Sequence, residues 1–139
     1  MSEQLVGALH FNLDLSQPLY EQILVQMRSF ITKGGIPLGG KIPSVRDMAR
    51  ELKINPNTVM HAYQELERDG LTEKRRGQGT FVTTSAQRVA EFRKRIAKTI
   101  TTRYLEEMRS LGLNEQEIHL YLINESEATA HDRSNRYGK

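Results

Sequence analysis

The chain has 139 residues, 37% of them hydrophobic and 27% charged, with a formal net charge of +3. It contains no cysteine, which excludes disulfides, thiolate metal sites and cysteine nucleophiles. The four histidines lack metal-site spacing, no apolar run approaches the ~20 residues of a membrane span, and the first residues do not resemble a secretory signal. We therefore expect a cytoplasmic protein without metal, cofactor or membrane contact, and the basic excess favours a partner such as nucleic acid.

Residues 1–14 are predicted to form a short N-terminal arm. Ser16 is a candidate N-cap for the helix that follows, and Pro18 suits its first turn. A Gly-Gly pair ends this helix, and the Gly- and Pro-rich stretch 36–43 is predicted to be a loop. The apolar stripe of the helix is Leu19, Tyr20, Ile23, Leu24, Met27, Phe30 and Ile31.

Two further helices, separated by a tight turn, are expected next. Ser44 and Asp47 form a capping-box-like start for the first of them. Asn55 and Pro56 begin the second, with asparagine as the N-cap and proline at the first helical position. The predicted buried residues of the two helices are Val45, Met48, Ala49, Leu52, Val59, Ala62, Tyr63 and Leu66.

A β-hairpin and a helical tail complete the pattern. Residues 71–74 and 80–83 are predicted strands, joined by a tip over residues 75–79. A long helix follows and ends at Gly112, and the segment 114–117 resembles a capping box that opens a short helix. Residues 124–139 are polar without periodicity, so we expect a frayed tail there.

The order of helix, helix, turn, helix and hairpin predicts a mainly α fold, a winged helix-turn-helix. The second helix of such a pair presents a polar face to the major groove of DNA. Its first turn is expected to direct free N–H groups at a phosphate or a base edge. Arginines and glycines at the hairpin tip favour contact with phosphates or the minor groove. The predicted DNA-binding residues are Ser44, Arg46, Asn57, Thr58, His61, Gln64, Arg75, Arg76, Gly77, Gln78 and Gly79.

Four motifs in this region resemble the DNA-binding domain of the GntR family, over roughly residues 12–83. They are IPSVRDMA at 42–49, NPNTV at 55–59, AYQELERDGL at 62–71 and GQGTFV at 77–82. The NPNTV motif is similar to the YtrA and MocR branches of the family. MocR proteins continue into a large aminotransferase-like domain, for which this chain has no room. The short helical tail therefore resembles that of YtrA-type regulators. The resemblance implies dimers that bind inverted-repeat operators, usually as repressors. It also implies that the DNA is contacted by Arg46, Asn55, Asn57, Thr58 and the wing over 75–79. Many relatives carry arginine where this chain has Pro56 and Met60, so base contacts of those arginines do not carry over.

Several alternatives stay open. Arg46 could pair with Asp47 or Glu51, Asn55 could be only a helix cap, and the basic run 93–95 could be a solvated face or touch flanking DNA. A small enzyme is disfavoured, because the sequence shows no clustered nucleophile, base and orienting group. A winged helix that binds protein instead of DNA is the alternative function, and it would show an apolar or acidic tip.

The predicted organisation is a DNA-binding domain over residues 1–84, a helical dimerisation tail over 85–123 and the frayed tail. A long helix cannot bury an apolar stripe alone, so the stripe either folds back on the winged helix or pairs with a second copy. We expect the dimer. The sequence does not identify a small-molecule effector. The predicted dimer contacts are Val89, Phe92, Ile96, Ile100, Tyr104, Met108, Leu111, Ile118, Tyr121 and Leu122.

Overall fold

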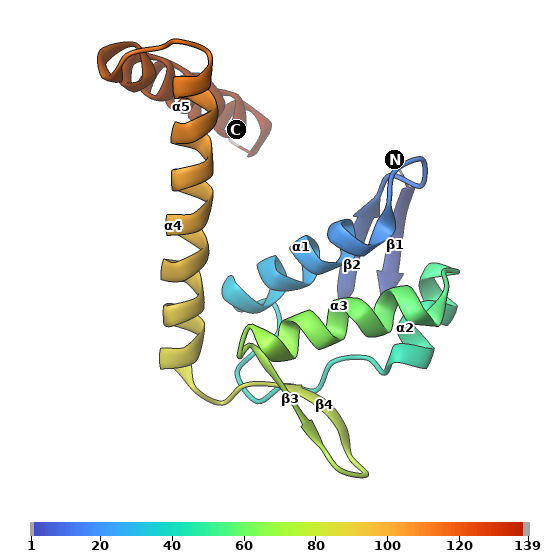
Figure 1. Cartoon of the computed structure of the whole chain (residues 1–139). Coiled ribbons are helices and arrows are strands. Elements are labelled where there is room, and N and C mark those ends of the chain that lie inside the picture. The colour runs from blue at the N-terminus through green and yellow to red at the C-terminus, as the bar shows by residue number, and fades with distance from the viewer. Residues whose placement is uncertain (1, 138–139) are drawn as a thin grey trace. The chain divides into compact units, whose positions relative to one another are not determined.

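A computed structural model describes residues 2–137, with the side chains of residues 3–132 (Figure 1). The chain forms two compact units, an N-terminal unit up to Arg95 and a C-terminal unit from Ile96 on. The predicted mainly α fold with a winged helix-turn-helix is confirmed. No helix in the described part of the chain is long and apolar enough to cross a membrane.

The predicted N-terminal arm is instead a β-hairpin. Strand β1 (Ser2–Val6) pairs antiparallel with β2 (Leu9–Leu13) around a tight turn that contains Gly7. Along β2, Leu9, Phe11 and Leu13 are buried while the residues between them are exposed, which is the alternation of a half-buried strand. The Phe11 ring packs edge-on against Phe30, with centroids 5.2 Å apart.

Helix α1 (Leu19–Thr32) does not start at a Ser16 cap. Pro18 occupies the N-cap position and no side chain caps the helix. Ser16 donates its hydroxyl to Asp14, at 2.7 Å, which holds the pKa of that carboxyl below its ordinary value. Gln22 secures the helix start instead, because its amide nitrogen donates to the carbonyl oxygens of Asp14 and Pro18, each at 2.9 Å.

Helices α2 (Val45–Leu52) and α3 (Pro56–Arg68) have the predicted caps. The Ser44 hydroxyl accepts from the Asp47 N–H at 3.0 Å, and the Asn55 side chain accepts from the Asn57 N–H at 2.8 Å. Lys53, in the turn between the helices, adopts a left-handed φ of 57°. Helix α3 packs on both α1 and α2, which places it at the centre of the N-terminal unit.

The wing is a hairpin supported by a third segment. Strands β3 (Thr72–Arg75) and β4 (Gly79–Val82) pair antiparallel, so the tip is residues 76–78, shorter than the predicted 75–79. Lys41 forms an isolated bridge to Phe81, and the Ile42 N–H donates to the Thr80 carbonyl at 3.0 Å. The loop before α2 therefore holds β4, which lies between this loop and β3.

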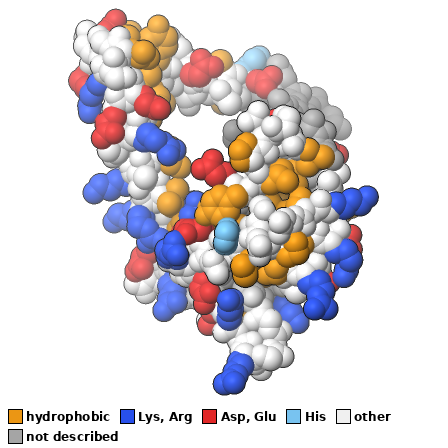
Figure 2. All heavy atoms as spheres, turned by 45° about the vertical axis from the view of Figure 1, so that its right-hand side comes forward, with side chains coloured by type: hydrophobic (Ala, Val, Ile, Leu, Met, Phe, Trp, Pro, Cys, Tyr) orange, Lys and Arg blue, Asp and Glu red, His pale blue; other side chains and the backbone are white. Residues whose placement is uncertain are grey.

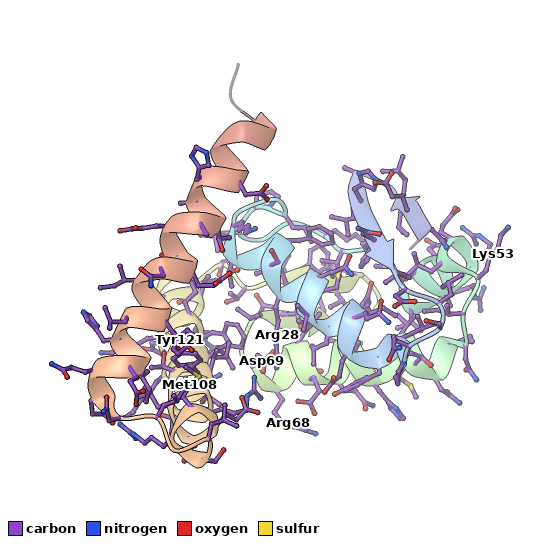
Figure 3. The ribbon with its side chains drawn as sticks, turned by 90° about the horizontal axis from the view of Figure 1, so that it is seen from above. Arg28, Lys53, Arg68, Asp69, Met108 and Tyr121 are labelled. Carbon is purple, nitrogen blue, oxygen red and sulfur yellow. The ribbon has the colours of Figure 1, made fainter. Side chains whose placement is uncertain are left out.

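The first turns of α4 (Ala86–Ser110) pack on the winged helix, which corrects the assignment of Phe92 to a dimer contact. Phe92 is 2% exposed, beneath the guanidinium of Arg28 at 5.3 Å. Arg28 makes a bidentate ion pair with Asp69, at 2.8 and 2.9 Å, and Arg95 donates to the Asp69 carbonyl at 3.3 Å. Figure 3 shows Arg28 and Asp69 side by side, with Lys53 at the other end of the unit.

The C-terminal unit contains the rest of α4 and helix α5 (Glu115–Tyr137). The predicted capping box is present, since Asn114 and Glu117 each accept the other's N–H at 2.9 Å. Arg109 pairs with Glu115 at 2.9 Å, and this hydrogen bond and charge hold the pKa of the Glu115 carboxyl below its ordinary value.

The frayed tail expected over 124–139 is helical to Tyr137, and residues 138–139 lie outside the described part. The expectation rested on missing apolar periodicity, whereas residues 113–137 contain no glycine or proline to stop the helix.

The Arg28–Asp69 pair yields a stability prediction. Asp69→Ala leaves the Arg28 guanidinium without its carboxylate partner, so we expect the free energy of unfolding to fall by on the order of 3 kcal/mol. Chemical denaturation followed by circular dichroism measures it. Arg68→Ala is the control, since the Arg68 side chain is 74% exposed in its ion pair with Glu65, and the pair should be worth less than ~1 kcal/mol. Equal effects of the two substitutions would contradict the structural role of Asp69.

Candidate nucleic-acid interface

The exposed face of α3 carries the predicted polar residues. Asn57, His61 and Gln64 are exposed and Thr58 is half-buried, while the opposite face enters the core. Residues three and four apart lie on one side of a helix, so Asn57, His61 and Gln64 form one continuous surface. The side chains on this surface donate and accept hydrogen bonds, as contacts to base edges require.

The first turn of α3 has no free N–H group, which corrects the expectation of backbone contacts there. Pro56 has no N–H, the Asn57 N–H is bound by the Asn55 side chain, and the Thr58 N–H donates to the Asn55 carbonyl at 3.0 Å. The cap role of Asn55 is thus confirmed. Any contact from this turn to a nucleic acid must come from side chains.

Tyr63 fixes the start of α2 relative to α3. Its buried hydroxyl donates to the Pro43 carbonyl at 2.7 Å, directly before Ser44. Burial, and secondarily the charge of Asp47, raises the pKa of Tyr63 well above its ordinary value, so the hydroxyl stays protonated and remains a donor. The exposed Ser44 and Arg46 are therefore held next to the face of α3.

Arg46 is not paired with the neighbouring carboxylates. Arg50 takes both, at 3.0 Å from Asp47 and 3.8 Å from Glu51. Within the described side chains we find no ion pair to Arg46, which is exposed at the first turn of α2. Its guanidinium is available for a phosphate or a guanine.

The two arginines of the wing are not equivalent. The Arg75 guanidinium stacks on the Phe81 ring at 4.1 Å and lies 3.8 Å from Glu73, so it braces the hairpin. Arg76 is exposed at the tip beside Gly77, whose φ is +74°. In Figure 2, Lys and Arg side chains lie on the lower part of the molecule, including the end of the hairpin. An acidic or apolar tip, as expected for a protein-binding wing, is not seen.

Lys41 is a basic residue of the wing that sequence reasoning missed. Gly79 has a φ of +119°, and a Cβ built there would lie 2.9 Å from the Lys41 Cε atom. The Lys41 side chain therefore crosses the wing over Gly79 and uses the room that glycine leaves. The loop composition of 36–43 concealed this placement, because the bridge to Phe81 joins residues far apart in the sequence.

The predicted dimer residues divide into buried and exposed sets. Phe92 and Ile118 are buried within their own chain. In the C-terminal unit, Ile100, Tyr104 and Leu122 line an open hollow of about 620 Å³ between α4 and α5. The exposed predicted residues are Ile100, Leu111, Tyr121 and Leu122, and those half-buried are Val89, Ile96, Tyr104 and Met108.

Comparisons with known proteins agree with this architecture. The family described as bacterial regulatory proteins, gntR family, matches residues 19–82, from the start of α1 to the end of the wing. A GntR family transcriptional regulator from Listeria monocytogenes is 34% identical, with a TM-score of 0.70, over 81% of this chain and 98% of that chain. YtrA from Sulfolobus acidocaldarius, a GntR-family transcription factor, is 28% identical with a TM-score of 0.55, over 69% and 97% of the two chains.

Two curated relatives come from Bacillus subtilis. The HTH-type transcriptional regulator YhcF is 39% identical over 74% of this chain and 85% of its own length. The HTH-type transcriptional repressor YtrA is 49% identical over 52% of this chain and 55% of its own length. The chain therefore belongs to the GntR family of bacterial regulatory proteins, as a YtrA-like transcription regulator with a DNA-binding winged helix.

Proposed function

We propose that the protein is a non-enzymatic, cytoplasmic repressor that binds an inverted-repeat operator in double-stranded DNA as a homodimer. The observation that carries this proposal is the polar face of α3, which lies with the exposed Arg46 of α2 and the basic wing formed by β3 and β4. Hydrogen-bonding side chains on a recognition helix select bases, and cations beside them bind phosphates. The repressor role is proposed from the curated YtrA relative.

The dimer is supported by apolar surface that the described residues leave uncovered. In the C-terminal unit, Ile100 is 50% exposed and Leu122 is 52% exposed at the rim of the hollow between α4 and α5. A second copy related by a two-fold axis would cover both rims with the same residues. Two recognition helices would then face successive turns of the DNA.

The first prediction concerns base recognition. Asn57→Ala and Thr58→Ala should each remove ~1–3 kcal/mol of discrimination between the operator and a mismatched site, since a side-chain contact to a base edge is lost. Fluorescence anisotropy with both DNA duplexes measures it. The α3 cap survives in Asn57→Ala, because it uses the backbone N–H. Glu67→Ala, exposed further along α3, is the control and should leave discrimination unchanged.

The second prediction concerns the wing cations. Arg76→Ala and Lys41→Gln should weaken binding to all sequences alike, and each should reduce the slope of log K against log salt concentration by about 0.9, the value of one phosphate contact. Salt titrations of operator and random DNA check this. Lys33→Gln, exposed after α1, is the matched control. An unchanged slope in Lys41→Gln would place this side chain away from the phosphates.

The third prediction concerns assembly. The wild-type chain should sediment as a dimer at micromolar concentration, and Ile100→Glu should shift it to a monomer, because the introduced carboxylate would be buried against a partner. Val25→Glu makes the same change on the exposed face of α1 and should leave the dimer intact. A monomeric wild-type chain would contradict the proposed homodimer.

A further inference from the structure

One large apolar side chain lies on the polar face of α3. Met60 is 38% exposed, one turn after Pro56 and between Asn57 and Gln64, its neighbours at three and four residues. The buried face of the helix is made by Val59, Ala62, Tyr63 and Leu66, so Met60 is not part of that core. Met60 thus places an apolar group between Asn57 and Gln64, two side chains that are expected to contact base edges.

Apolar residues lie between the start of α3 and α2. Pro56 lines an open hollow with Val45, Ala49 and Ile54, and the side chains of Arg46 and Arg50 complete its lining. Tyr63, one turn after Met60 on the same flank, is joined to the residue before Ser44 by its hydrogen bond to Pro43. Met60 follows Pro56 by four residues, so these two apolar side chains lie on the same side of α3.

The major groove offers one apolar group, the C5-methyl of thymine. Methionine suits it, because its unbranched, polarisable side chain adapts to irregular contacts. A cytosine at the same place lacks this methyl group, so the apolar contact would be lost. We infer that Met60 is a specificity-determining residue that contacts a thymine methyl group and selects thymine at one position of the operator half-site. This inference rests on the proposed DNA recognition by α3.

The test removes one methyl group at a time. An operator is first obtained by selection from random DNA with the full chain, and each thymine is then replaced singly by deoxyuridine, which lacks only the C5-methyl. At one thymine per half-site we expect binding to weaken about fourfold, since a buried methyl-sized group is worth ~0.8 kcal/mol and 1.4 kcal/mol is tenfold. Fluorescence anisotropy at fixed salt gives the affinities.

The variants assign the effect to Met60. In Met60→Gln, of similar length and helix propensity, the loss at that thymine should disappear while the losses at other thymines persist. Met60→Leu should retain it. Val25→Gln, which also replaces an exposed apolar side chain by glutamine but on α1, should reproduce the wild-type profile. Thermal unfolding of each variant verifies that it is folded.

Two results would overturn the inference: every thymine tolerates deoxyuridine, or the sensitive thymine keeps its fourfold loss in Met60→Gln. In either case the operator would still be selected, so DNA recognition by α3 would stand. If selection enriched no sequence at all, the proposed function itself would fail.

Discussion

The ion pair between Arg28 and Asp69 is the contact on which the N-terminal unit depends. Asp69 ends α3, and Gly70, with a φ of +83°, turns the chain from there toward β3. Arg28 lies in the middle of α1, so the pair sets where the recognition helix ends against the core helix. The same guanidinium covers the Phe92 ring, and Arg95 donates to the Asp69 carbonyl. Asp69 thus joins α1 through its carboxylate and the first turns of α4 through its backbone carbonyl to the end of α3.

Capping decides how α3 can contact DNA. Because Pro56 lacks an N–H and Asn55 binds the next two, the positive end of the helix offers its dipole but no donor. In the proposed complex, base selection by this turn would therefore fall to the side chains. The wing is built in the opposite way, since Gly77 and Gly79 shape its backbone, and in the proposed complex its cations would contact phosphates without regard to sequence.

Local signals in the sequence predicted most of the N-terminal unit. The caps at Ser44 and Asn55 involve residues two and three apart, so the pattern alone contains them. The hairpin β1–β2 was visible only in the alternation of Leu9, Phe11 and Leu13, which the mixed polarity of β1 obscured. Lys41 and Phe92 were misplaced for another reason. Their neighbours, Phe81 and Arg28, lie far away in the sequence, and periodicity reports which face is buried but not what buries it.

The packing of the first turns of α4 on the winged helix also bears on specificity in the proposed dimer. Discrimination per base pair is only ~1–3 kcal/mol and roughly additive, so a regulator gains selectivity by joining two half-sites. Joining them helps only if both recognition helices fit the operator at once, because effective concentration falls when the connection allows many spacings. Phe92, Arg28 and Asp69 fix the first turns of α4 to the end of α3. In the proposed dimer, a loose attachment of α4 would leave each half-site contact intact and still lower operator selectivity, so we expect the ion pair to influence which DNA is bound.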